Sequence, residues 1–560
     1  MNDGTMLNAY PDSLGGTLKD IADFLESPAC RDAFRSAYVL PSLFHTDLDR
    51  GFSVISYDLD RRLADPESLD RIRAAGIDLK LDFILNHLSV LSPQFQDLLQ
   101  KGDASPYRDF FIHWNDFWAG HGAMIAEGYI QPDAEYLREM FTRKPGLPLL
   151  MVRFPDGRDV PYWNTFYQAV RYDAPDTQDW MRLLGLQYGE AAELAALVNA
   201  ALERGETPAQ MALGRYASQH AQVAEALESR RKYLGQMDLN LQSERVWDYY
   251  DQTLKTLAGY GAAIVRLDAF AYAPKAPGRR NFMNEPETWE VLERVRQLAD
   301  GYGLTLLPEI HAAYAEGIHE TLAQKGYMTY DFFLPGLLID ALEGGDAAAL
   351  VGWIQELRGK GIRTVNMLGC HDGIPLLDLK GLIPDVRIQA LIDLIVSRGG
   401  LVKNLHGQKN VYYQVNATYY SALGEDDRKM LLARALQLFM PGKPQVWYLD
   451  LFGGRNDLAA AARGGAAGHK EINRTNLTAA QVAEGLQRPL VQNQLKLLRM
   501  RNRCPAFAAD ARLIVEQKAP HAISLRWEKG GASAVLEADL RSMAFSVHAD
   551  WPGEVFAFAQ

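Results

Sequence analysis

Three acidic residues in the middle of the chain each follow a short apolar run and have a basic residue close by. Asp268 and Glu309 end two such runs, with His311 two positions after Glu309, and Asp372 directly follows His371. A retaining attack on a glycosidic bond needs an ionised carboxylate as nucleophile and a protonated carboxyl group as acid, about 5 Å apart. The three acids therefore indicate glycoside chemistry, provided that the fold gathers them.

The neighbours of these acids predict opposite pKa shifts. In a strand, Arg266 and Asp268 point to the same face, so the guanidinium should lower the pKa of Asp268 and keep it ionised. Glu309 lies among apolar residues, and burial should raise its pKa and keep it protonated. Taken singly, each acid would ordinarily be a solvated loop residue or an ion-pair partner, and only the three together favour glycoside chemistry.

Eight short apolar runs, separated by stretches typical of helices, define the predicted fold. The runs lie at 6–10, 37–41, 78–86, 262–268, 305–309, 328–333, 364–370 and 444–448. Alternation of this kind predicts parallel strands with crossover helices. Because several runs end in polar residues, which form the active-site face of such barrels, we predict an α/β fold built on a (β/α)8 TIM barrel.

The uneven spacing of the runs predicts inserted subdomains. About 175 residues separate the third and fourth runs, far more than a loop needs. We expect barrel strands 1–3 in residues 1–87, a B subdomain in 88–235 with a helical insert at about 173–234, and barrel strands 4–7 in 236–372. A B′ subdomain in 373–427, the end of the barrel in 428–504 and a small antiparallel β domain in 505–560 would follow. The stretch 449–478 looks like loop.

Composition excludes several classes of protein. Of 560 residues, 48% are hydrophobic and 23% are charged, which is typical of globular proteins rather than disordered ones, and the net charge is −12. So acidic a chain is a poor partner for nucleic acid or an anionic membrane. Three scattered cysteines, no long apolar run and no basic-apolar leader favour a cytoplasmic enzyme. No Gly-rich dinucleotide loop or metal-binding cluster appears, so we expect no cofactor and no metal.

Four segments resemble the signature regions of the α-amylase superfamily, in the same order. They are residues 82–87, 265–270, 307–311 and 370–373. Further segments at 49–53, 107–112, 163–166, 413–423, 441–448, 454–457 and 472–474 resemble one branch of that superfamily, the sucrose-phosphorylase-like enzymes. The resemblance covers most of residues 6–507. This branch also contains phosphorylases for sucrose 6′-phosphate, glucosylglycerol and glucosylglycerate.

The resemblance implies roles for matched residues. Asp268 would form a covalent β-glucosyl intermediate, Glu309 would act as acid and then base, and Asp372 would stabilise the transition state. The remaining residues implied to bind substrate are Asp49 and Arg474 at distal hydroxyls, His87 and His371 at nearer ones, Phe52 and Phe166 as an apolar platform, Arg266 beside Asp268, and Gln236, His311 and Gln414. Arg143, Lys144 and Tyr413 would belong to acceptor or phosphate loops. Outside the motifs, the histidines and phenylalanines would ordinarily be core residues.

The implied reaction is a double displacement that yields α-glucose 1-phosphate when phosphate is the acceptor. Because phosphate is anionic, His311, Arg143 and Lys144 are the cations expected to admit it. Sucrose is the favoured donor, with sucrose 6′-phosphate, glucosylglycerol and glucosylglycerate as alternatives. The second candidate function is that of a transglucosidase or hydrolase of the superfamily. A non-catalytic sugar-binding scaffold is the least favoured function.

Two departures from the branch bear on these expectations. Sucrose phosphorylases carry a Leu-Asp-x-Tyr-Gln segment whose Asp faces fructose, whereas this chain reads Asn410-Val411-Tyr412-Tyr413-Gln414. The loss of that acid weakens the case for free fructose as the leaving group. Phe166 and Gln236, near neighbours in typical relatives, are separated here by the helical insert, which could cap the active site or form the interface of a homodimer.

Overall fold

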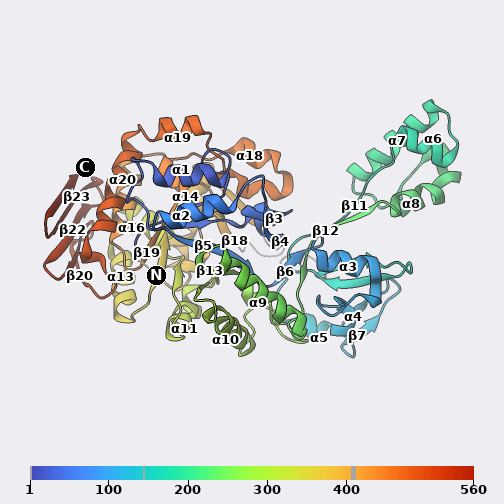
Figure 1. Ribbon diagram of the computed structural model, residues 1–560, viewed down its shortest axis with the longest axis horizontal. Helices are drawn as coiled ribbons and strands as arrows, with labels where there is room; N and C mark the ends of the chain where they lie inside the picture. The colour runs from blue at the N-terminus through green and yellow to red at the C-terminus, as the bar shows by residue number, and fades with distance from the viewer. Residues whose placement is uncertain (1–2, 143–145, 405–411) are drawn as a thin grey trace. The chain divides into compact units, whose positions relative to one another are not determined.

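The computed structural model describes residues 3–142, 146–404 and 412–560, without the side chains at 403–404, 412–413 and 465–467. The chain divides into two compact units (Figure 1). The first comprises Met1–His87, Ala134–Gly146 and Leu239–Gln560, and the second comprises Leu88–Asp133 and Leu147–Asp238. The finer six-part division that the sequence suggests stays a prediction.

Eight parallel strands form one sheet in the first unit, in the spatial order β14-β13-β5-β2-β1-β19-β16-β15. In chain order they are β1 (Met6–Ala9), β2 (Ser36–Val39), β5 (Asp78–Ile84), β13 (Ala262–Asp268), β14 (Thr305–Pro308), β15 (Thr329–Asp331), β16 (Thr364–Met367) and β19 (Lys443–Trp447). The end strands β14 and β15 contact each other, so the sheet is nearly closed. The predicted barrel is confirmed.

Helices alternate with these strands. In chain order they are α1 (Leu18–Glu26), α2 (Pro66–Ala74), α5 (Ala134–Leu137), α9 (Glu244–Gly259), α10 (Glu287–Asp300), α11 (Ile318–Gln324), α12 (Leu334–Gly344), α13 (Ala348–Gly359), α14 (Asp385–Ser397), α15 (Tyr419–Ala422), α16 (Asp427–Phe439), α17 (Tyr448–Phe452), α18 (Leu458–Arg463), α19 (Ala479–Gly485) and α20 (Pro489–Arg503). In α9, buried Val246, Tyr250, Leu254 and Leu257 recur at helical spacing. Such an apolar stripe packs a helix against the sheet, and α9 contacts β5 and β13.

The segment after β19 differs from the expectation of a loop. It contains α17, α18 and the 3₁₀ helix η9 (Gly465–Asn473). The glycines at 464, 465 and 468 suggest a loop from composition, yet Gly468 lies where a side chain would meet the carbonyl oxygen of Ala461, so the glycine permits close packing of the helical turns. This turn places Lys470 and Arg474 in the site described below.

The second unit is built from short strands and a helical insert. Its elements outside the insert are β6 (His87–Ser89), α3 (Pro93–Lys101), α4 (Trp114–Phe117), β7 (Gly122–Met124), β8 (Ile130–Pro132), β9 (Leu149–Arg153), β10 (Asp159–Trp163), β11 (Gln168–Tyr172) and β12 (Arg231–Asp238). β11 and β12 pair antiparallel from Gln168↔Gly235 to Tyr172↔Arg231, so the insert leaves and re-enters the unit through one hairpin.

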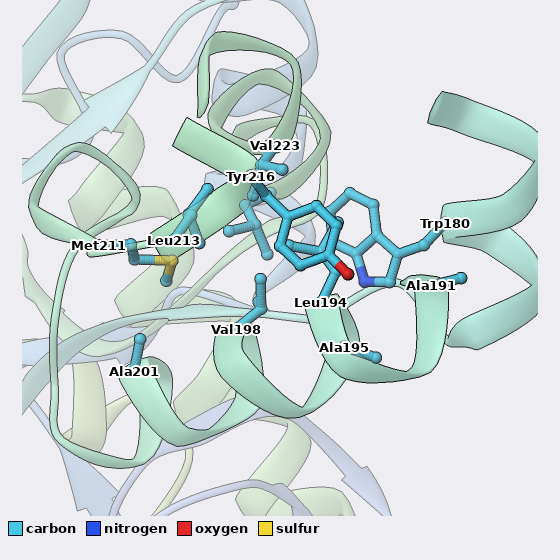
Figure 2. Packing of buried hydrophobic residues seen from close by; sticks show 11 residues of the cluster. Trp180, Ala191, Leu194, Ala195, Val198, Ala201, Met211, Leu213, Tyr216 and Val223 are labelled. Atoms are coloured by element: carbon cyan, nitrogen blue, oxygen red, sulfur yellow. The ribbon is translucent and has the colours of Figure 1, made fainter. Parts of the chain in front are cut away.

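The insert has a hydrophobic core of its own. Helices α6 (Thr177–Leu184), α7 (Tyr188–Glu203) and α8 (His220–Glu228) supply most of it. Figure 2 shows Trp180, Leu194, Val198 and Tyr216 gathered in this cluster, and Trp180 is fully buried. Because a separate core supplies its own burial energy, the insert is a folded element rather than a long loop.

Five antiparallel strands form the last sheet of the chain. In sequence and spatial order they are β20 (Arg512–Ala519), β21 (Ala522–Lys529), β22 (Ala532–Asp539), β23 (Ala544–Trp551) and β24 (Glu554–Ala559). The alternation of buried and exposed residues along β23 is the period-2 pattern expected of such a strand, so the predicted C-terminal β domain is confirmed. Among the described residues, no helix has the length and apolar character needed to cross a membrane.

Candidate active site

One buried guanidinium joins three carboxylates at the carboxyl end of the barrel strands. Arg266 Nη1 lies 2.6 Å from Asp82 Oδ1 and 3.0 Å from Asp268 Oδ1, and its Nη2 lies 2.6 Å from Glu309 Oε1. The Arg266 side chain is 2% exposed. A single planar cation that contacts both Asp268 and Glu309 holds the two acids close together, as retaining chemistry requires.

The register of adjacent strands produces this meeting. β13 pairs with β14 so that Arg266 is opposite Leu307, and the Glu309 amide donates to the Leu267 carbonyl at 3.2 Å. Directly after Asp268, Ala269 has a left-handed φ of 55°, which ends the strand abruptly. Asp268 and Glu309 thus stand at neighbouring strand ends, facing the same guanidinium.

The pKa values of this pair reverse the sequence-based expectation. Burial raises the pKa of Asp268 well above its ordinary value, more than Arg266 lowers it. Burial also acts to raise the pKa of Glu309, but Arg266 and His311 outweigh it and hold that pKa at about 2. The prediction that Glu309 is the protonated member and Asp268 the ionised one was wrong for this arrangement, because Arg266 approaches Glu309 more closely than Asp268.

Asp372 faces a second set of cations. Lys470 Nζ lies 2.8 Å from its Oδ1 and His371 Nε2 lies 3.1 Å from its Oδ2. Burial acts to raise the pKa of Asp372, but His371 and Lys470 outweigh it and hold that pKa well below its ordinary value. This carboxylate is therefore ionised and rigidly held, which suits a group that grips hydroxyls.

Asp49 approaches the same cations from the loop after β2. Its Oδ1 lies 3.5 Å from Arg474 Nη1 and its Oδ2 lies 3.5 Å from Lys470 Nζ. Arg474 Nη2 lies 3.7 Å from Asp372 and, among the described residues, is buried without a hydrogen-bond partner. A buried donor of this kind is costly unless a ligand satisfies it, which marks the space between Asp49 and Asp372 as a polar subsite.

Backbone strain fixes the position of Asp49. Asp49 and Arg50 have φ values of 47° and 48°, and Gly51 follows at 118°. A Cβ on Gly51 would lie 2.4 Å from the Ser42 nitrogen, so only glycine fits there. Arg50 lies 4.0 Å from the centre of the Tyr10 ring, and it donates to Asp12 at 3.1 Å and to the Arg474 carbonyl. These contacts offset the strain and tie the loop to Arg474.

An aromatic surface lies beside the charged groups. The Phe52 ring stacks on the His371 ring at 4.9 Å and 11°, and His87 Nε2 lies 3.0 Å from the Phe52 carbonyl oxygen. Arg266 lies 5.4 Å from the centre of the Phe52 ring. Phe52, His87 and His371 are all buried. The structure therefore brings these three predicted residues to the same site as Arg266 and Asp372.

His311 stands on the other side of Glu309. Its Nε2 lies 3.6 Å from Glu309 Oε1 and 3.4 Å from Gln414 Nε2, while its Nδ1 lies 2.8 Å from Asp378 Oδ2. Burial lowers the pKa of His311, but Asp378 and Glu309 outweigh it and raise that pKa to about 9. The imidazole is therefore cationic at neutral pH.

Comparison with known proteins identifies the family. The sequence matches no family model. It is 50% identical over 551 residues to a sucrose 6(F)-phosphate phosphorylase of Ilumatobacter coccineus, covering 97% of this chain and 95% of the relative. It is 30% identical to a sucrose phosphorylase of Streptococcus mutans, covering 97% of each chain. The chain belongs to the sucrose-phosphorylase-like branch of the α-amylase superfamily.

A solved structure from this branch has the same fold. The crystal structure of sucrose 6F-phosphate phosphorylase from Thermoanaerobacter thermosaccharolyticum matches with a TM-score of 0.81 at 30% identity, covering 100% of this chain and 98% of that chain. The resemblance stated from the motifs is confirmed, and the protein is an enzyme that acts on glycosyl groups.

Five of the residues predicted from the branch are not placed at the site. Phe166 follows β10 and Gln236 lies in β12, and both belong to the second unit. Arg143 and Lys144 lie outside the described residues, and Tyr413 is in β18 (Tyr412–Asn416) with its side chain outside the description. The predictions for these five residues stay predictions.

Two contacts at the site were missed from the sequence. Lys470 bridges Asp49 and Asp372, and Asp378, on the 3₁₀ helix η8 (Leu377–Leu379), pairs with His311. The four-residue spacing from Lys470 to Arg474, about one helical turn, was an available signal. Asp378 gave no such signal in the sequence, because its partner His311 lies 67 positions away.

The described residues contain one group of possible metal ligands, away from these acids in the sequence. His319, Glu320 and Glu356 bring their ligand atoms within 4.8 Å of one another. Lys360 Nζ lies 2.7 Å from Glu320 and 2.8 Å from Glu356, so its ammonium is already ion-paired with both carboxylates. The donor set therefore forms an ion-pair cluster and does not fit a cation site.

Proposed function

We propose that this enzyme is a retaining glucosyl phosphorylase that converts an α-glucoside and inorganic phosphate into α-glucose 1-phosphate. The observation that carries the proposal is the contact of one buried guanidinium with both Asp268 and Glu309. That contact keeps two acids at neighbouring strand ends within reach of one anomeric carbon. The relatives are named as phosphorylases, which supports phosphate as the acceptor.

Each of the three acids has one role in the proposed reaction. The proton that the free site favours on Asp268 first passes to Glu309; the ionised Asp268 then attacks the anomeric carbon and forms the covalent glucosyl intermediate, while Glu309 gives that proton to the leaving oxygen. Asp372 holds hydroxyls of the same hexose and stabilises the positive charge that develops on the ring. In the second step an acceptor oxygen displaces Asp268 from the same face, which gives retention.

The charged groups around Asp372 suit a hexose. Asp49, Lys470 and Arg474 present acceptors and donors within one small region, and Arg474 Nη2 is buried without a hydrogen-bond partner in the described part of the chain. Phe52 supplies an apolar face against which a sugar ring can lie. Polar groups at a rim and one aromatic face are the usual means of recognising a sugar's hydroxyls and its ring.

We propose sucrose 6′-phosphate as the donor, in place of the sucrose that the sequence favoured. The relative that is 50% identical carries that specificity in its name. The segment at 410–414 lacks the acid that faces fructose in sucrose phosphorylases, and a phosphorylated leaving group would disfavour such an acid. Sucrose stays the second candidate, because the Streptococcus mutans relative is named for it.

A phosphate-dependent donor screen tests the proposal. Glucose 1-phosphate release is measured from sucrose 6′-phosphate, sucrose, glucosylglycerol and glucosylglycerate, each with and without inorganic phosphate. We expect the highest kcat/KM with sucrose 6′-phosphate, and no product from Asp268→Ala. Release of free glucose at the same rate without phosphate would indicate a hydrolase, and equal activities of wild type and Asp268→Ala would indicate a non-catalytic scaffold.

The cations predicted to admit phosphate can be tested in the same assay. Neutral replacements of His311, Arg143 and Lys144 should raise the KM for phosphate, since each removes positive charge from the predicted acceptor loops. An unchanged KM for phosphate in all three variants would remove these residues from the proposal.

We also propose that the enzyme works in the cytoplasm and as a homodimer. Support for a reducing compartment comes from Cys30, Cys370 and Cys504, which are all buried thiols without a disulfide. Light scattering after size-exclusion chromatography tests the dimer, and a monomeric mass would refute it.

A further inference from the structure

Asp378 lies behind His311, on the side away from Glu309. It follows Asp372 by six positions and sits on η8, and its side chain is 4% exposed. Its Oδ2 lies 2.8 Å from His311 Nδ1, a distance typical of a charge-assisted hydrogen bond. Asp378 is thus a buried acid that contacts a residue of the site and has no assigned role.

The pairing fixes the orientation of the imidazole. Phe332 stacks on the His311 ring with centroids 3.8 Å apart and planes at 22°. With Nδ1 bound by Asp378 and one face covered by Phe332, the ring turns Nε2 toward Glu309 at 3.6 Å and Gln414 at 3.4 Å. The nitrogen that faces Glu309 is therefore set by contacts on the opposite edge of the ring.

The groups around His311 also set its charge. Glu309 approaches from the end of β14 and Asp378 from η8, while Phe332 and Gln414 are neutral. Arg266 lies beyond Glu309 and is itself paired with Asp82 and Glu309. The two acids raise the pKa of His311 to about 9 against the effect of burial. Of the two, Asp378 is the closer and makes the larger contribution.

We propose that Asp378 is a positioning residue that keeps His311 protonated, with Nε2–H directed toward Glu309, so that the imidazolium binds inorganic phosphate as the acceptor. The inference rests on the proposed function. Phosphate must approach an anomeric carbon that lies between carboxylates, so it needs a fixed positive charge at that point. A neutral imidazole would offer a donor without the charge.

The substitution Asp378→Asn separates this role from a structural one. The amide keeps the shape and a hydrogen bond to Nδ1 but removes the negative charge. We expect the His311 titration midpoint, followed by NMR with ¹³Cε1-labelled histidine and assigned by its loss in His311→Gln, to fall from near 9 in the wild type to below 7. The KM for phosphate should rise about 10- to 100-fold, as loss of a charged hydrogen bond predicts.

A comparison of two donors shows whether His311 binds inorganic phosphate or the phosphoryl group of the sugar. With sucrose or with sucrose 6′-phosphate, Asp378→Asn should raise the KM for inorganic phosphate and leave the KM of the donor unchanged. A rise confined to the KM of sucrose 6′-phosphate would mean that His311 binds the phosphoryl group of the sugar, and would overturn the proposal. A wild-type His311 midpoint near 6.5 would also overturn it.

Matched variants control for folding. Asp340→Asn removes another buried acid, whose partner is Arg387 on α14, and should leave both KM values unchanged. His311→Gln removes the cation without altering Asp378, so the double variant should be no worse than either single variant. If the wild type makes no glucose 1-phosphate from any donor, the proposed function fails, whereas the NMR midpoints still decide whether Asp378 holds His311 protonated.

Discussion

Replacing Glu309 by glutamine removes an acidic proton while keeping the size of the side chain and an oxygen that can accept from Arg266. A positioned general acid contributes about 10²–10⁴-fold to a rate, which corresponds to about 3–5 kcal/mol of barrier. A sugar alkoxide needs that proton to leave, whereas fluoride does not. We therefore expect Glu309→Gln to lose about 10²–10⁴-fold in kcat/KM with sucrose 6′-phosphate and less than about tenfold with α-glucosyl fluoride.

The structure shows which contacts the substitution leaves in place. Glu309 Oε1 is 2.6 Å from Arg266 Nη2 and 3.6 Å from His311 Nε2, and a glutamine oxygen can accept from both, so the loss of rate reports the missing proton. The assay is glucose 1-phosphate release from both donors at saturating phosphate. Asp268→Asn is the control, because loss of the nucleophile should abolish transfer from both donors. Equal losses on the two donors in Glu309→Gln would refute the assignment of Glu309 as the acid.

Three further substitutions test other parts of the structure. Lys470→Met should lower kcat/KM for every glucosyl donor by about tenfold or more, because Asp49 and Asp372, which Lys470 bridges, lose a charged contact. An unchanged kcat/KM would remove Lys470 from the hexose subsite. Gly51→Ala should destabilise the fold in urea by about 1–3 kcal/mol more than Gly76→Ala, since both glycines have a left-handed φ but open space surrounds only Gly76. Trp180→Ala should cost the helical insert about 3–5 kcal/mol and speed hydrogen exchange in α6–α8 while the barrel strands stay protected; uniform exchange would show that the insert does not unfold separately.

Local pattern was enough to predict the barrel. Each of the eight observed strands overlaps a predicted apolar run, because strands buried in a parallel sheet need continuous apolar residues. Helix α20 (Pro489–Arg503) likewise begins where a local signal stands, because proline suits the first helical turn. By contrast, the glycines after β19 made the sequence look like a loop where the structure has the 3₁₀ helix η9. At Gly468 the glycine allows two helical turns to pack closely, and no periodic pattern in the sequence indicates such packing.

Positions at the site followed from motifs, whereas their electrostatics did not. Strand alternation correctly placed Arg266 beside Asp268. It could not reveal that the other nitrogen of Arg266 would reach Glu309, which comes from the next strand, or that Asp378 and Lys470 would arrive from segments tens of residues away. A pKa depends on all of these through-space neighbours, so the sequence assigned the proton to the wrong member of the pair.

The reversed pKa values define what a glucosyl donor must change. Asp268 and Glu309 share one guanidinium, and their opposite pKa shifts favour a proton on Asp268 rather than on Glu309. Catalysis needs that proton on Glu309 and a charge on Asp268. Moving it from Asp268 to Glu309 creates the acid and the nucleophile in one step, provided that Arg266 transfers its closer contact from Glu309 to Asp268. A donor whose leaving oxygen accepts a hydrogen bond from protonated Glu309 stabilises that second arrangement. On the proposed function, substrate binding and activation of the two acids would be a single event, coupled by Arg266, which contacts both.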